Sequence, residues 1–157
     1  MPLNPPYLVS AVFCDKVLLE QDGVPSAIRI VDRIFVQKLS KEGVVPGGLY
    51  ALTLLLMFKS GGYKGAAKIQ IILRPPSGAG RPIIEQEIVI PEQVNAGANI
   101  VATVPLAPNE EGVYWFDVLL NGELVTRTPL EVQVLPLQVP SSPSAKTESD
   151  TNSDGKK

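Results

Sequence analysis

Short runs of alternating apolar and polar residues occupy most of the chain up to about residue 135. Successive side chains of a β-strand point to opposite faces, so a period of two predicts strands with one buried face. Gly, Pro, Asn and Asp cluster between these runs, as is typical of turns. About eight or nine strands are therefore expected. Their predicted ranges are 7–14, 16–20, 26–39, 49–59, 66–74, 83–90 and 98–106, with two more within 112–134.

The pattern predicts one all-β domain, an antiparallel β-sandwich. No window carries apolar residues at the helical period, and the runs are rich in β-branched residues. We expect an N-terminal extension at 1–6, the sandwich domain at 7–138 and a disordered polar tail at 139–157. From Pro140 onward the chain has no aromatic residue and no Leu, Ile or Val, so burial cannot offset the entropy of ordering it.

The stretch 112–134 predicts a closing hairpin whose turn contains Asn121 and Gly122. A two-residue turn would set Leu120 opposite Glu123 and Phe116 opposite Arg127, which mixes core with surface. A three-residue loop would instead set Val118 opposite Leu124. Because a shift of one residue moves every side chain to the other face, we expect the three-residue loop, with a bulge at Gly122.

Two segments carry a family likeness. The opening "AVFCDKVLLEQDGVPSAIRIVDRI" at 11–34 and the closing "EGVYWFDVLLNGELVTRTPLEV" at 111–132 resemble the two signatures of a bacterial family of unknown function. Its small single-domain proteins open on a strand that ends in Cys-Asp and close on a Gly-x-Tyr strand followed by Asn-Gly-Glu. The likeness spans roughly Tyr7 to Leu135. It implies an immunoglobulin-like β-sandwich and brings no activity with it.

Charge and cysteine content indicate which partners and which compartment to expect. The net charge of −2 and the absence of a Lys/Arg run argue against nucleic-acid and membrane-surface partners. The longest apolar run, at 49–58, is much shorter than the roughly 20 residues of a membrane helix. Cys14 is the single cysteine, so no intramolecular disulfide can form. That favours a reducing compartment, and we expect a cytoplasmic protein.

The residues do not predict an enzyme. The chain has no histidine, which removes Ser-His and Cys-His nucleophile pairs and imidazole-bound zinc. Cys14 is interpreted as a packed thiol. Glu85 and Glu87 lie two residues apart, so they share a strand face; they are interpreted as a solvated face rather than an acid/base pair. We therefore predict no catalytic residue, no cofactor and no metal site.

Two polar patterns stay open as weaker hypotheses. Asp32 interrupts an apolar strand face, which indicates either a bulge or structural hydrogen bond, or a binding site. Asp150, Asn152, Asp154 and Gly155 match the first half of a calcium loop, but the chain ends before its glutamate.

Two features indicate a partner. Trp115 lies on the face of its strand that is predicted to point outward, and the run at 49–58 is apolar on both faces. A sandwich covers one face of each sheet, so something must cover the other. A loop or the N-terminal segment would do this, and so would a protein partner or a second copy. The possible interface residues are Trp115, Tyr50, Leu52, Leu54, Leu56 and Phe58.

The expected function is a non-catalytic binding or structural module that self-associates through an apolar sheet face. The alternative is a small-ligand or carbohydrate carrier that uses loops at one end of the sandwich. A deep apolar pocket with convergent polar groups favours the carrier, and a flat apolar patch favours the module.

Overall fold

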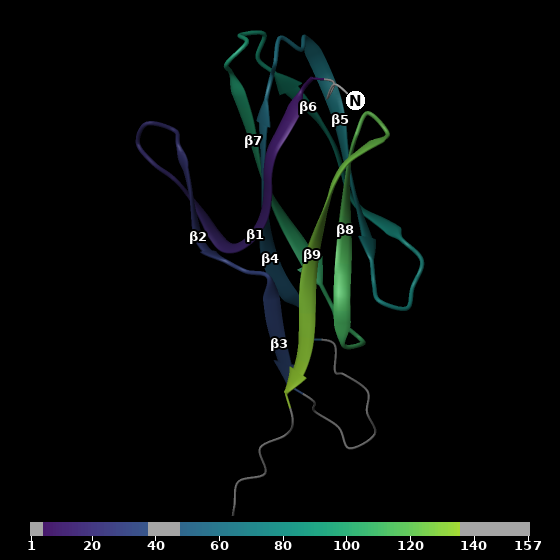
Figure 1. Ribbon diagram of the computed structural model, residues 1–157. Coiled ribbons are helices and arrows are strands. Elements are labelled where there is room, and N and C mark those ends of the chain that lie inside the picture. Colours follow the sequence, from purple (N-terminus) through teal and green to yellow (C-terminus); the bar gives the residue numbers. More distant parts are fainter. Residues whose placement is uncertain (1–4, 38–47, 136–157) are drawn as a thin grey trace, which may run out of the picture.

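The computed structural model describes residues 5–37 and 48–135, and these form nine strands and no helix (Figure 1). The all-β prediction is therefore confirmed for this part of the chain. The strands are β1 (Tyr7–Leu19), β2 (Pro25–Ile30), β3 (Arg33–Gln37), β4 (Tyr50–Lys59), β5 (Gly65–Arg74), β6 (Arg81–Ile90), β7 (Gly97–Leu106), β8 (Gly112–Leu120) and β9 (Glu123–Leu135).

The strands form two sheets. The four-stranded sheet has the order β2-β1-β4-β7, and the five-stranded sheet has the order β3-β9-β8-β5-β6. In Figure 1 β1 bends between its two halves, so that its second half and β2 project from the body as a two-stranded ribbon. We call this ribbon, residues 14–30, the β1–β2 arm.

The core lies between the two sheets and follows from the period of two. In β4 the even-numbered residues from Leu52 to Phe58 enter it, and in β8 Tyr114, Phe116 and Val118 meet them from the other sheet. Phe13 and Phe116 pack edge to face with their ring centroids 4.7 Å apart. One face of each sheet is thus buried against the other sheet.

One pairing departs from the antiparallel prediction, because β3 runs parallel to β9. The segment predicted as a single strand at 26–39 divides at Val31 and Asp32, where the chain leaves one sheet and enters the other. Both sides of this crossing are tied by backbone hydrogen bonds: Val31 N–H donates to the carbonyl of Phe13, and Glu131 N–H donates to the carbonyl of Asp32. A crossing between sheets lets an early strand lie beside the last one.

The structure also corrects the predicted hairpin. Leu120 pairs directly with Glu123, so Asn121 and Gly122 form a two-residue turn in which both have positive φ angles, 50° and 85°. The register then shifts between Val118 and Leu119, and Val118 pairs with Thr126. The conflict between turn and core is therefore resolved by an extra residue in β9 rather than by a longer loop.

Three predictions fall on residues that the structure does not describe. The polar tail at 139–157 and the half calcium loop at 150–155 lie outside the described residues, as do residues 1–4 of the predicted extension.

Candidate functional site

The predicted interface on β4 lies on the wrong face of that strand. Leu52, Leu54, Leu56 and Phe58 belong to the core, and Tyr50 packs partly against it. Their side chains meet the five-stranded sheet of the same chain, so a partner cannot reach them in the folded protein. The apolar pattern on both faces of 49–58 did not indicate which face would be internal.

The opposite face of β4 lies on the outside of the four-stranded sheet and is apolar at Leu55 and Met57. Leu55 pairs with Val12 on one side and with Val101 on the other, which makes an apolar row across three strands. Met57 follows on the same face, and Cys14 lies in the neighbouring row opposite Thr53. Leu55 and Cys14 are buried, whereas Val101 is about half exposed at 47%. We call Val12, Cys14, Leu55, Met57 and Val101 the outer apolar face.

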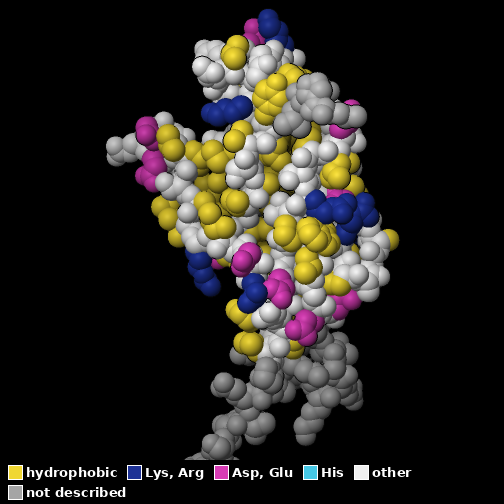
Figure 2. Space-filling model, in the orientation of Figure 1, with side chains coloured by type: hydrophobic (Ala, Val, Ile, Leu, Met, Phe, Trp, Pro, Cys, Tyr) yellow, Lys and Arg dark blue, Asp and Glu magenta, His cyan; other side chains and the backbone are white. Residues whose placement is uncertain are grey.

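The β1–β2 arm continues this apolar surface. Ile30 pairs with Cys14, so its side chain extends the same face, and Ile28 follows two residues earlier. Ile30 is 65% exposed, and Leu19 and Val24 near the tip of the arm are also exposed. Figure 2 shows hydrophobic side chains gathered in the angle between the arm and the body of the molecule. Among the described strands β2 pairs only with β1, so the arm has little to pack against.

The outside of the five-stranded sheet is different, because ion pairs organise it. Asp117 on β8 is only 3% exposed and lies between Arg74 on β5 and Arg127 on β9. Each arginine Nε lies 2.6 Å from a carboxylate oxygen of Asp117. Burial by itself would raise the pKa of Asp117, but the hydrogen bonds and charges of the two arginines outweigh it and hold the pKa below its usual value.

Trp115 lies beside this ion-pair cluster, on the outward face as predicted. Its side chain is 39% exposed, and the guanidinium of Arg127 stacks over its ring at 5.9 Å from the centroid. Arg74 and Pro129 are its partners on the neighbouring strands. The exposed fraction of Trp115 thus reflects a packed position within a polar surface. Sequence reasoning missed Asp117 as a buried charge; its only signal was an acidic residue within an otherwise apolar strand.

The other residues that the sequence offered as candidates lie in surroundings typical of structural or solvent-exposed positions. Cys14 is buried, and this burial raises the pKa of its thiol. Glu85 makes an ion pair with Lys68 at 2.6 Å on the exposed face of β6, and Glu87 is also exposed on that face. The side chain of Asp32 is exposed at the crossing between the sheets. Within residues 5–37 and 48–135 no three His, Cys, Asp or Glu residues are grouped so as to hold a metal ion.

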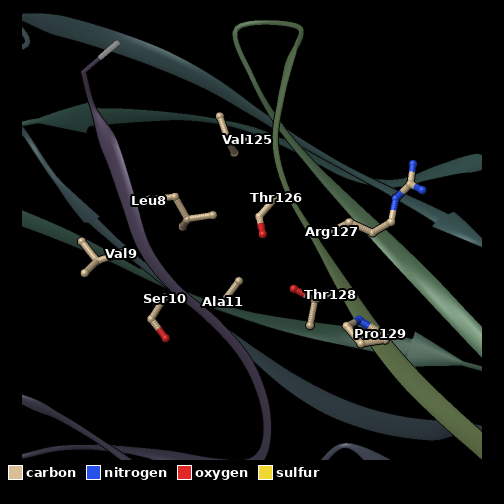
Figure 3. A pocket seen from close by; sticks show the side chains of 9 residues that line it. All are labelled: Leu8, Val9, Ser10, Ala11, Val125, Thr126, Arg127, Thr128 and Pro129. Atoms are coloured by element: carbon tan, nitrogen blue, oxygen red, sulfur yellow. The ribbon is translucent and has the colours of Figure 1, made fainter. Parts of the chain in front are cut away.

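A shallow hollow lies where β1 and β9 face each other across the two sheets. Its volume is about 230 Å³, and its lining comes from residues 8–11 of β1 and 125–129 of β9. Figure 3 shows Leu8 and Thr126 pointing toward each other across it, while the guanidinium of Arg127 points away. The volume is below the roughly 300–1,000 Å³ of common ligand pockets. The hollow also lies along the strands, not among the end loops.

A buried tyrosine fixes the start of β8. Tyr114 Oη donates to the carbonyl of Glu110 at 3.0 Å and accepts from Glu110 N–H at 3.3 Å. The side chain of Tyr114 is 2% exposed, and this burial raises the pKa of its hydroxyl. The bonds hold the chain that leads from β7 into the five-stranded sheet.

Comparison with known proteins gives distant structural neighbours only. No protein-family model matches the chain, and no curated protein matches it. Among solved structures, part of the Pseudomonas fluorescens alkylpurine DNA glycosylase AlkC bound to DNA aligns over 65% of this chain and 27% of its own, with 13% identity and a TM-score of 0.42. The β-glucosidase from Listeria innocua in complex with glucose aligns over 68% of this chain and 15% of its own, with 14% identity and a TM-score of 0.44.

The chain thus spans well under a third of either neighbour, and likeness at this level carries no argument about activity. Among the described residues there is no helix of the length and apolarity that crossing a membrane requires. The cytoplasmic location expected from the sequence stays a prediction.

Proposed function

We propose that this protein is a non-catalytic binding module that engages a partner protein through the outer apolar face and the β1–β2 arm. One observation carries the proposal: on the outside of the four-stranded sheet an apolar row, Val12–Leu55–Val101, crosses three strands, and its end at Val101 is about half exposed. In most antiparallel sheets the face away from the core is polar. A contiguous apolar outer face is typical of a surface that another molecule covers.

The arm supports this proposal independently. A two-stranded ribbon is marginally stable in water unless its apolar side chains are covered. Leu19, Ile28 and Ile30 are exposed on the arm. A partner that packs against the arm and the outer apolar face together would bury these side chains and hold the ribbon in place.

Two carboxylates at the tip of the arm bear on the chemistry of the partner. Glu20 and Asp22 are exposed at its tip, and Asp22 also accepts a hydrogen bond from Val24 N–H in the turn. These carboxylates favour a partner that presents an apolar segment flanked by lysine or arginine residues. Because such exposed charges act mainly on the rate of association, salt should slow binding more than it weakens the apolar contact.

We also propose that the domain is immunoglobulin-like and belongs to the bacterial family whose signatures it resembles. Two features support the architecture. The order β9-β8-β5-β6 within the five-stranded sheet and the order β1-β4-β7 within the four-stranded sheet correspond to the two sheets of immunoglobulin domains. Tyr114 at the start of β8 bonds back to the backbone of Glu110, which matches the tyrosine corner of that fold. The arm is an addition to that plan.

The alternative, a small-ligand carrier, has weaker support. The hollow between β1 and β9 is small, and its position between strands does not agree with a site among end loops. The apolar surface of the arm gives the protein-binding proposal the stronger physical basis.

A photo-crosslinking amino acid placed at position 30 tests the proposal in cells that produce the full chain. Ile30 is 65% exposed on the arm, so the probe would contact whatever covers it. We expect a discrete adduct heavier than the chain by the mass of one other protein. An adduct of twice the chain mass would identify a second copy on the arm and contradict the proposed partner.

The matched control carries the same probe at position 89. Val89 is 76% exposed on β6, in the other sheet and away from the proposed surface. It should give no such adduct. Identical adducts from both positions, or none from position 30, would refute the proposal.

A further inference from the structure

The four strands at the edges of the sheets differ in how they are protected against pairing with another chain. An edge strand presents unpaired N–H and C=O groups, and proteins commonly block it with charges, prolines, bulges or short length. In the four-stranded sheet the edges are β2 and β7, and in the five-stranded sheet they are β3 and β6.

Three of these edges carry protection. In β2, which has six residues, Arg29 has a positive φ angle of 53° that breaks the regular strand. β3 has five residues and begins with Arg33. β6 contains Pro82 and two glutamates, and its pairing with β5 has a register shift.

β7 has few of these devices. Its ten residues include no charged side chain, and all ten pair with β4 without a register shift. Pro105 is its only proline and lies next to the end of the strand. Among the described strands β7 pairs only with β4, so its second edge is open.

The hydrogen-bond pattern shows which residues face this open edge. Ser60 N–H donates to the carbonyl of Ala96, which is the first pair beyond the β4–β7 ladder. Hydrogen-bonded pairs alternate along an antiparallel ladder. The even-numbered residues of β7 therefore bond to β4, and Asn99, Val101 and Thr103 present their N–H and C=O groups outward.

We propose that β7 is a self-association edge at which a second copy of this chain pairs antiparallel through its own β7. A two-fold axis at Val101 sets Val101 opposite its own symmetry mate and Asn99 opposite Thr103 of the second copy. In this register Asn99, Val101 and Thr103 of each copy point their N–H and C=O groups at the other copy. The two β7 strands can therefore exchange hydrogen bonds. The two four-stranded sheets become one continuous sheet.

Charge favours a second copy as the occupant of this edge. Under a two-fold axis the residue on the axis faces its own copy and the residues on either side of it face each other, so an edge with like charges would bring them together. The glutamates of β6 would meet this penalty, and the uncharged β7 does not. Valine opposite valine and asparagine opposite threonine are compatible pairs on a strand surface. This inference goes beyond the proposed protein partner, because pairing at the edge uses the backbone groups of β7; Val101 is the one residue that the edge shares with the outer apolar face.

The experiment compares Val101→Lys with Val89→Lys in the full chain by light scattering across micromolar concentrations. Each variant replaces one exposed valine on an edge strand by lysine. We expect wild type and Val89→Lys to have the mass of a dimer, and Val101→Lys to have half that mass with an unchanged circular dichroism spectrum. A monomeric wild type, or a dimeric Val101→Lys, would overturn the proposal.

Cross-linking tests the register without disturbing the edge. Residues in a hydrogen-bonded antiparallel pair have Cα atoms about 5.5 Å apart, which is within the range of a disulfide. Oxidised Val101→Cys should therefore form a covalent dimer, whereas Val89→Cys and the wild type, whose Cys14 is buried, should not. Failure of Val101→Cys to cross-link while the protein is dimeric would contradict this pairing.

Discussion

The outer faces of the two sheets differ in the side chains that they present. On the five-stranded sheet, charges pair across neighbouring strands: Asp117 lies between two arginines, Lys68 meets Glu85, and Arg33 meets Glu131. On the four-stranded sheet, the corresponding positions form the row Val12–Leu55–Val101. Both sheets have the same alternation toward the core. Alternation therefore distinguishes the two faces of a strand. Whether the side chains of the outer face are charged or apolar depends on what that face contacts.

Two adjacent leucines in β4 test this comparison, with the largest expected effect on stability. Leu54 faces the core and Leu55 faces outward, although both are almost fully buried. Leu54→Ala should lower the free energy of unfolding by about 3–4 kcal/mol because it leaves a closed cavity. Leu55→Ala should cost about 1–2 kcal/mol, since water and neighbouring side chains can fill its place. Urea denaturation of both variants measures the difference, and equal losses would mean that the outer face is packed like the core.

Removing the charge of Asp117 tests the polar outer face. Asp117→Asn keeps the size of the side chain but loses its charge-assisted hydrogen bonds to Arg74 and Arg127. We expect a loss of about 2 kcal/mol, less than for a fully buried ion pair because both arginines are nearly half exposed. Thermal unfolding measures it. An unchanged stability would show that the cluster is dispensable.

The same variant predicts a pH dependence. Because its folded pKa is lowered, Asp117 contributes stability above the pKa of the unfolded chain, about 4, and this contribution is lost as pH falls through the folded pKa. Wild-type stability should therefore fall more steeply than that of Asp117→Asn below about pH 4. Parallel pH profiles would remove Asp117 as a source of acid sensitivity.

The smallest effect is expected at an exposed ion pair. Glu85→Gln removes the partner of Lys68, but both side chains are more than half exposed. Exposed ion pairs are screened by water and contribute little to stability, so the midpoint of urea unfolding should hardly move. Gln70, which also bonds to Glu85, can bond to the new amide. A loss as large as that of Asp117→Asn would mean that the two clusters act as one network.

The candidate surfaces were only partly predictable from the sequence. Trp115 was placed correctly on an outward face, but its contact with Arg127 depends on a register set by the bulge in β9. The apolar character of 49–58 predicts an interface at Tyr50, Leu52, Leu54, Leu56 and Phe58, but that face of β4 packs in the core; both faces carry apolar residues, so the pattern does not distinguish them. The sequence pattern predicts ordinary strands for the arm, because it does not show that β1 bends away from the body.

The amino-acid sequence by itself determined an all-β fold, because side chains at a period of two can bury one face only as strands. It also determined which residues of β8 enter the core, since Tyr114, Phe116 and Val118 alternate with exposed or charged neighbours. Only the tertiary structure decided the parallel pairing of β3, the two-residue turn with its compensating bulge, and the open edge of β7. These features depend on which distant strands meet, and local alternation carries no information about such partners.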